Sequence, residues 1–192
     1  MNLTCRVNKP IIFLSIVAAL VLLRGIETSI PLVPYGPVYY KMGLGYAGKG
    51  HKAKAMDYYR KSVHSDPNFA DAYYQMGKIY ADQKRYEMAL TNLQKAIDVS
   101  PKHHQAYTAL GHMYRSLGDH EKALSAFRKA NAFCVQYPYA PQYLLNLGEI
   151  YSDMGDKGKV WDVIKDLERM GESRLAGKLK VRVFLEMSEM EK

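Results

Sequence analysis

Histidine and cysteine are the side chains in this sequence best suited to hold a metal ion. His103 and His104 are adjacent, so on a helix they would point in different directions. His104 and His112 are about two helical turns apart, which is too far for both to bind one ion. His120 falls in a predicted turn. We therefore expect these histidines to face solvent or a groove, and we predict no metal site.

Four common motifs of catalytic and metal-binding sites are absent from the chain. It contains no C-x-x-C, no H-E-x-x-H, no phosphate-binding loop and no nucleophile elbow. Cys5 and Cys134 are not expected to meet, and Cys134 is interpreted as a small buried apolar residue. The sequence therefore predicts a protein that is not an enzyme and has no cofactor. Only a metal or cofactor bound to the purified protein would indicate a hidden enzyme.

A glycine followed three residues later by a tyrosine recurs four times in the chain. The pairs are Gly43 and Tyr46, Gly77 and Tyr80, Gly111 and Tyr114, and Gly148 and Tyr151, at intervals of 34, 34 and 37 residues. A regular period in this range indicates a stack of helical repeats. Such stacks build extended grooves that bind partners, so the elements of this chain favour binding over catalysis.

Each repeat has the spacing of two packed helices when its glycine is numbered position 8. Positions 4, 7 and 11 lie on one face of a first helix, and positions 20, 24 and 27 lie on one face of a second. Small residues at 8 and 20 allow close approach, while large residues at 4, 11 and 24 fill the space around them. Glycine at position 15 suits a left-handed turn, although Lys84 stands there in the second repeat. Pro67 and Pro101, at position 32, end the second helix of their repeats.

This pattern resembles the tetratricopeptide repeat family from residue 36 to about residue 170. The closest match is the segment 73–80 with Ala89, Leu93, Ala96 and Pro101. The resemblance implies an all-α, right-handed α-solenoid of about four helix pairs and a C-terminal capping helix. The implied repeats are about 36–69, 70–103, 104–140 and 141–172, and the capping helix is 173–191. Ser62, where the family prefers alanine, and the larger side chains of the fourth repeat's second helix depart from the family pattern.

In this family, ligands lie along the concave face that the first helices form. Carried over residue by residue, the resemblance implies a partner-binding groove of Tyr40, Lys41, Tyr74, Gln75, Lys78, Gln105, Thr108, His112, Arg115, Asn146 and Glu149. Lys78 and Arg115 are expected to meet a carboxylate, and the tyrosines to pack on apolar side chains. The clamp that some members use for chaperone tails is not expected, because Tyr40 and Leu44 replace its first lysine and asparagine. The alternative is a partly exposed face without a dedicated ligand.

Three further tyrosines gather where three extra residues lengthen the third repeat. They are Tyr137, Tyr139 and Tyr143. Tyrosine is enriched at protein interfaces because it has an apolar body and a polar tip. The cluster is either a second contact site or a loop that closes the third repeat, and both interpretations stay open.

The N-terminal region contains an unbroken apolar run from Ile11 to Leu23 with basic residues on both sides. Thirteen residues of helix span roughly 20 Å, less than the ~30 Å hydrocarbon core, which favours a signal peptide. No small-x-small cleavage site follows, however, and Arg24 stands where one is expected. We predict an uncleaved single-pass anchor at 1–30, a transmembrane helix that contacts the bilayer through residues 10–26. A proline-rich linker at 31–38 joins it to the repeat domain at 36–192.

Basic residues are distributed unevenly along the chain. Residues 36–140 carry 15 basic and 8 acidic side chains, whereas residues 141–192 carry 9 and 10. The basic part suits anionic lipid headgroups or an acidic partner, and it is equally consistent with an ordinary solvated surface. Nucleic acid is not expected as a partner, because the sequence has no dense Lys/Arg run and no known nucleic-acid module.

These features together predict a membrane-tethered adaptor that assembles or stabilises a respiratory, photosynthetic or secretion-type membrane complex through protein contacts. The excess of basic groups before the apolar run places the repeats on the outer side, which is the periplasm in a bacterium. The alternative is a periplasmic peptide-binding module released from the membrane by cleavage.

The intact mass of the mature protein should distinguish these two interpretations. An uncleaved anchor predicts a mature chain that retains residues 1–24, because no cleavage site follows the apolar run. Mass spectrometry of protein purified from its native membrane measures this directly. A first residue beyond 24 would rule out the anchor.

Overall fold

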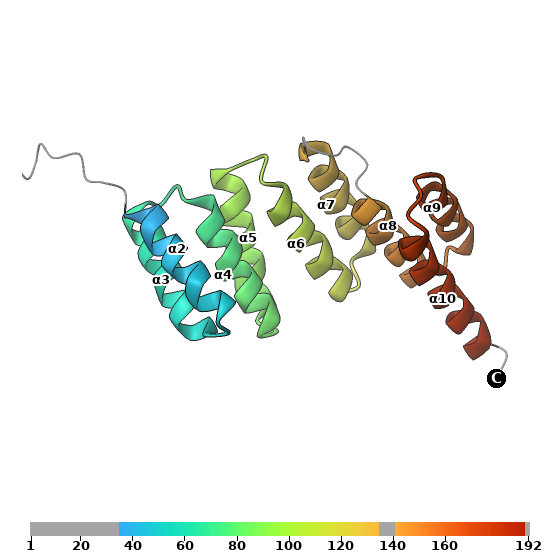
Figure 1. The fold of residues 1–192 in the computed structure, drawn as a ribbon, viewed down its shortest axis with the longest axis horizontal. Helices are drawn as coiled ribbons and strands as arrows, with labels where there is room; N and C mark the ends of the chain where they lie inside the picture. The colour runs from blue at the N-terminus through green and yellow to red at the C-terminus, as the bar shows by residue number, and fades with distance from the viewer. Residues whose placement is uncertain (1–34, 135–140, 191–192) are drawn as a thin grey trace, which may run out of the picture. The chain divides into compact units, whose positions relative to one another are not determined.

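The computed structural model describes residues 35–134 and 141–190, which form nine α-helices and no strand (Figure 1). The helices are α2 (Gly36–Gly48), α3 (Lys52–Ser65), α4 (Ala70–Asp82), α5 (Tyr86–Val99), α6 (His104–Ser116), α7 (His120–Phe133), α8 (Pro141–Asp153), α9 (Lys157–Arg169) and α10 (Ser173–Met190). The predicted all-α class is confirmed. Residues 36–38, which fall within both the predicted linker and the predicted repeat domain, form the start of α2.

The helices stack in sequence order as four pairs followed by one terminal helix. The pairs are α2 with α3, α4 with α5, α6 with α7, and α8 with α9. The second helix of each of the first three pairs also packs against the first helix of the next pair, and α10 packs against both α8 and α9. This is the solenoid that the repeat period predicts, in which each unit contacts only its neighbours.

Close approach within each of the first three pairs depends on the glycine at position 8. A Cβ atom added to Gly77 would lie 2.8 Å from Cγ of Leu93, and one added to Gly111 would lie 2.7 Å from the ring of Phe127. A Cβ atom added to Gly43 would likewise overlap the ring of Tyr59. The three large residues all stand at position 24 and are fully buried. The repeated glycine is therefore required because a large side chain of the second helix occupies the space beside it.

The fourth glycine accommodates a different helix. A Cβ atom added to Gly148 would collide with Leu179 of α10, and it would lie 3.2 Å from Val163 of α9. Leu179 belongs to the buried side of α10 together with Ala176 and Val183. The second helix of this repeat departs from the family pattern at the end of the stack, where the terminal helix takes the space beside the glycine.

The turns between paired helices use left-handed backbone at position 15. Gly50, Gly118 and Gly155 have φ values of 79°, 78° and 74°. Lys84 has φ of 59° at the same position and is the single non-glycine residue with positive φ in the described part of the chain. Since a side chain in this conformation costs roughly 1–2 kcal/mol, the second repeat tolerates local strain to keep the same turn.

The serine at position 27 of the first repeat has a structural reason. Ser62 is completely buried, and its hydroxyl donates a hydrogen bond of 2.7 Å to the carbonyl oxygen of Gly36. A Cβ atom on Gly36 would lie 2.8 Å from Cβ of Asp66. The two residues together hold the beginning of α2 against the end of α3.

In the described part of the chain, no helix is long and apolar enough to span a membrane. The predicted anchor at 1–30, its bilayer-contacting residues 10–26 and linker residues 31–34 all lie outside the described residues. The anchor therefore stays a prediction from sequence.

Two alanine substitutions should separate glycines that the packing requires from glycines that it does not. Gly111→Ala should lower the free energy of unfolding by about 1–3 kcal/mol, because its methyl group overlaps the ring of Phe127. Gly45→Ala in α2 has no heavy atom within 4 Å of the added carbon and should raise it by up to about 1 kcal/mol through helix propensity. Urea unfolding monitored by circular dichroism measures both. Equal stability of the two variants would contradict the packing interpretation.

Candidate binding groove

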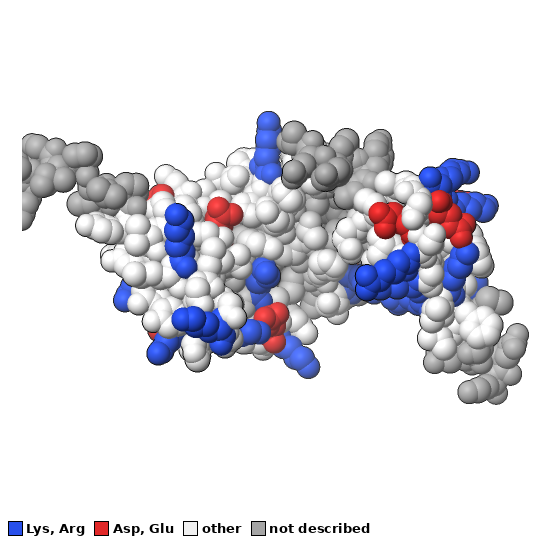
Figure 2. Space-filling view, in the orientation of Figure 1, with Lys and Arg blue, Asp and Glu red and all other residues white. Residues whose placement is uncertain are grey.

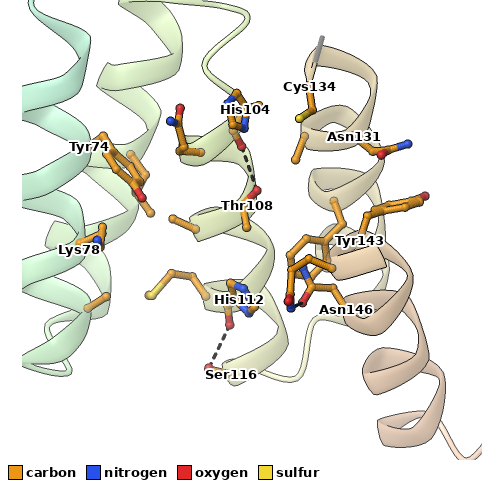
Figure 3. A pocket seen from close by; sticks show the side chains of 18 of the residues that line it. Tyr74, Lys78, His104, Thr108, His112, Ser116, Asn131, Cys134, Tyr143 and Asn146 are labelled. Carbon is orange, nitrogen blue, oxygen red and sulfur yellow. Dashed lines mark hydrogen bonds between the residues drawn. The ribbon is translucent and has the colours of Figure 1, made fainter. Parts of the chain in front are cut away.

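A groove of about 800 Å³ opens along the second, third and fourth repeats and is lined by residues of α4 to α8 (Figure 3). Six of the eleven predicted contact residues line it: Tyr74, Lys78, Gln105, Thr108, His112 and Asn146. Tyr143, which was assigned to a second contact cluster, lines the same groove. Tyr137 and Tyr139 lie outside the described residues. The structure thus brings six residues of the predicted groove and one residue of the predicted second contact site to the same surface.

The predicted contact residues of the first repeat, Tyr40 and Lys41, do not line this groove. The ring centroid of Tyr40 lies 5.8 Å from that of Tyr59 and 5.1 Å from that of Phe69. Burial raises the pKa of Tyr40, while a hydrogen bond to Gln75 acts in the opposite direction. Tyr40 and Gln75 therefore contact each other, and neither they nor the exposed Lys41 of α2 line the groove.

Arg115 and Glu149 are paired with each other. The Nε atom of Arg115 donates to a carboxylate oxygen of Asp153 at 2.6 Å, and its Nη1 atom donates to Glu149. Asp153 also accepts from Arg182 of α10. This network joins α6, α8 and α10. The chain itself supplies the carboxylates that Arg115 binds. Lys78, the other residue expected to meet a partner's carboxylate, has no ion pair among the described residues.

His103 has a structural role that the sequence analysis missed. Its side chain is only 7% exposed, and its Nδ1 atom accepts a hydrogen bond of 3.2 Å from the backbone N–H of Ala106 at the start of α6. Its Nε2 atom lies 3.1 Å from Oδ1 of Asp71, on α4. Because Nδ1 accepts, Nε2 carries the hydrogen and donates to the carboxylate. The expectation that His103 faces solvent or a groove was wrong. Its place just before a helix was the available signal for an N-cap.

His112 stands in the groove as an uncharged group at neutral pH. Its ring lies edge-on to Phe127, with ring centroids 5.1 Å apart. His112 is exposed at the surface of the groove, but desolvation by the surrounding groove atoms lowers its pKa; Glu149 acts to raise it, and Arg115 acts to lower it. Because the ordinary histidine pKa is already about 6.5, the lowered value leaves the imidazole neutral at pH 7. It can therefore donate and accept hydrogen bonds but does not attract anions.

The groove combines an apolar lining with amides and with the charged side chains of Lys78, Lys84 and Asp82. Tyr86 and Ala109, which are partly exposed, supply apolar surface. Asn146 is 3% exposed and its Oδ1 atom accepts from Gln142 at 3.3 Å, while the ammonium of Lys78 lies 5.5 Å from the ring centroid of Tyr74. Figure 3 shows Tyr74 and Lys78 across the groove from Tyr143 and Asn146. Such a surface suits a polypeptide segment with apolar side chains and a carboxylate placed near α4.

Within the described ranges, no group of three histidine, cysteine or carboxylate side chains is placed to hold a metal ion. His112 and His120 both line a smaller, polar depression beside Arg115 and Asp153. The chemistry of that depression is dominated by the ion pairs already described.

The helices stack in pairs that pack closely at a repeated glycine, and a groove runs along the stack. These features define a helical repeat protein. Sequence models of the tetratricopeptide repeat match residues 36–69 and 68–134, which together make up more than half of the chain. The chain belongs to the tetratricopeptide repeat family.

Solved structures show the same fold at low sequence identity. A crystal structure of MamA is 24% identical, with a TM-score of 0.58, and the match covers 83% of this chain and 85% of MamA. A second MamA structure, labelled AMB-1, is 19% identical, also with a TM-score of 0.58, and the match covers 72% of this chain and 74% of that one. These values establish similarity of fold.

A further similar structure holds a bound peptide. It is the first tetratricopeptide repeat domain of Spaghetti (RPAP3) bound to the HSP90 peptide SRMEEVD, with 19% identity, a TM-score of 0.58, and coverage of 62% of this chain and 93% of that one. No match was found among curated proteins. The repeats and these structural neighbours support a scaffold for protein–protein interaction.

Acidification should destabilise the fold through His112. Its pKa is lower in the folded protein than in the unfolded chain, so the stability linked to its neutral form is present above pH 6.5 and is lost as pH falls through the folded-state pKa. His112→Asn should therefore lose less stability than wild type between pH 7 and pH 5. Urea unfolding at both pH values measures the difference, and an NMR titration gives the pKa itself. A His112 pKa above 6.5 would contradict the assignment.

Proposed function

We propose that the protein is a non-enzymatic scaffold that binds a segment of a partner protein in the groove formed by its second, third and fourth repeats. The observation that carries this proposal is the groove itself. It has a volume of about 800 Å³ and a largely apolar lining bordered by polar groups. A groove of this kind buries apolar side chains of a partner and fixes the register of the bound segment through a few polar contacts.

Lys78 indicates that the proposed partner carries a negative charge where it contacts α4. It has no ion-pair partner among the described residues, whereas Arg115 is already paired within the chain. His112 is neutral at pH 7 and adds no positive charge. The bound segment is therefore apolar with a carboxylate from an acidic side chain or a chain terminus, and that carboxylate lies beside Lys78 and Tyr74.

Membrane tethering is the second part of the proposal and rests on the sequence alone. The apolar run from Ile11 to Leu23, without a cleavage site after it, supports an anchor with the repeats on the outer side of the membrane. In this role the scaffold holds a subunit of a respiratory, photosynthetic or secretion-type complex at the bilayer. Release by cleavage, which yields a periplasmic peptide-binding module, is the alternative. Co-purification of partners from detergent-solubilised membranes supports the first role, and recovery of the protein alone and without detergent counts against it.

Two lysines of the second repeat provide a matched test of the groove. Lys78 and Lys95 each lie over a tyrosine ring, 5.5 Å from Tyr74 and 5.8 Å from Tyr73, but only Lys78 lines the groove. Lys78→Ala should weaken partner binding about tenfold, the loss expected for one charge-assisted hydrogen bond. Lys95→Ala should leave binding unchanged. Quantitative crosslinking and mass spectrometry in native membranes measures both.

The double substitution of Tyr74 and Lys78 by alanine should weaken binding further while preserving the helical content. Circular dichroism supplies that control. Unchanged partner recovery with both side chains removed would contradict binding at this groove and would point instead to the region of Tyr137 and Tyr139.

A further inference from the structure

A second depression is lined by residues of α5, α6 and α7. It has a volume of about 230 Å³ and shares no lining residue with the binding groove. Pockets that take whole small molecules are typically about 300–1,000 Å³, so this one has room for single side chains of a partner. We call it the lysine furrow, and its lining residues are Gln94, Ile97, Tyr107, Leu110, Tyr114, Lys122, Ser125, Ala126 and Lys129.

Two ammonium groups of the furrow lie over tyrosine rings of α6. The Nζ atom of Lys129 is 5.7 Å from the ring centroid of Tyr107, and that of Lys122 is 5.6 Å from the ring centroid of Tyr114. Lys122 also pairs with Asp119 at 2.6 Å, whereas Lys129 has no ion pair among the described residues. Because an ammonium has three donors, one that rests on a ring keeps hydrogens for an anionic acceptor.

The charge of Lys129 is not balanced by the surroundings of the furrow. No aspartate or glutamate is among the described residues that line it. Asp98, on the flanking helix α5, accepts a hydrogen bond of 2.9 Å from Gln94. Arg128 and Glu121 are exposed on α7, and their charges offset each other. The furrow therefore keeps a net positive charge that suits a negative group of a partner.

The lysine at position 26 recurs in the first three repeats. Lys61, Lys95 and Lys129 follow one another at intervals of 34 residues. Their ammonium groups lie 5.1, 5.8 and 5.7 Å from the centroid of a tyrosine ring. None of the three has an ion pair in the described part of the chain. The placement of Lys129 is thus part of a repeated arrangement on the second helices.

The fourth repeat lacks this arrangement. Asp162 and Asp166 stand where Ser125 and Lys129 stand in the third repeat. Asp166 pairs with Arg169 of its own helix at 2.9 Å. On the face shown in Figure 2, acidic and basic side chains lie together at the α9–α10 end. The chain therefore contains a natural pair of residues that should not bind an anion at the same place in the repeat.

We propose that the lysine furrow is a second binding site, which takes the carboxylates of an acidic, extended segment of a partner protein. Lys122 and Lys129 are seven residues apart on α7, or about 10 Å. An extended polypeptide spans this distance in about three residues, so the segment carries acidic side chains about three positions apart. Each carboxylate accepts charge-assisted hydrogen bonds from one lysine, and the exposed hydroxyl of Ser125 is a further donor. The segment is distinct from the one in the groove, so this proposal is independent of the proposed function.

The geometry favours an acidic polypeptide over other anions. The two ammonium groups lie over rings in a depression, whereas a flat lipid surface meets lysines that project from the protein. Nucleic acid is bound through many closely spaced phosphate contacts, and the lysines at position 26 are a whole repeat apart. Single carboxylates on flexible side chains can enter the furrow and reach both lysines.

Fluorescence anisotropy with a labelled, short poly-glutamate peptide tests the site in the full-length chain, kept in solution with a nonionic amphipol. Lys129→Gln should weaken binding of the peptide about fivefold, the upper end for an exposed ion pair. Ser125→Asp combined with Lys129→Asp installs the residues of the fourth repeat and should abolish binding. Circular dichroism should show unchanged helicity for both variants.

Two control variants separate the furrow from general attraction and from the groove. Lys102→Gln removes the same charge from an exposed residue that lines neither depression, and it should leave the affinity unchanged. Lys78→Ala, in the groove, should also leave it unchanged. A loss from either control equal to that of Lys129→Gln would overturn the proposal. Absence of peptide binding would overturn it too, as would Lys129-dependent binding of an oligothymidylate or of phosphatidylglycerol vesicles in place of the peptide.

Discussion

The structure depends on one repeated contact, in which a glycine of the first helix lies directly against a large buried side chain of the second. Gly43, Gly77 and Gly111 leave room for Tyr59, Leu93 and Phe127, and any larger residue at these positions would separate the helices. Since interiors are close-packed, this separation would also disturb the neighbouring pairs. The contact fixes the spacing within each pair, and the spacing fixes how pairs stack. Helices α4 to α8 of this stack form the walls of the groove.

The contact changes at the end of the stack, and polar interactions become important there. Gly148 receives Leu179 of the terminal helix, and the ion pairs of Arg115 connect the third repeat to the fourth. In the second repeat His103 performs a similar task by capping α6 and binding Asp71 of α4. These partly buried polar contacts join α4, α6 and α8, which are helices that also line the groove.

The period of the sequence predicts what each repeat shares, and it fails where repeats differ. Helix pairs, left-handed turns and the large residues at position 24 follow from recurring positions, and even Lys84 keeps the turn expected of glycine. A repeat period cannot predict contacts that occur in one repeat only. The capping by His103 depends on a donor three residues later, and the pairing of Arg115 with Glu149 depends on a residue in the next repeat. Carry-over from the family therefore identified the groove-lining Tyr74 and Lys78 but also included Tyr40 and Gln75, which contact each other.

The central claim is that a partner protein occupies the groove of the second to fourth repeats. A photo-crosslinking amino acid placed at Gln105 lies in that groove, whereas one placed at Lys129 of α7 lies outside it, over the ring of Tyr107. In cells that express the full-length chain, crosslinking from position 105 should give one discrete adduct with a specific protein, and that adduct should be missing from position 129. Equal adducts from both positions, or none from position 105, would contradict the account.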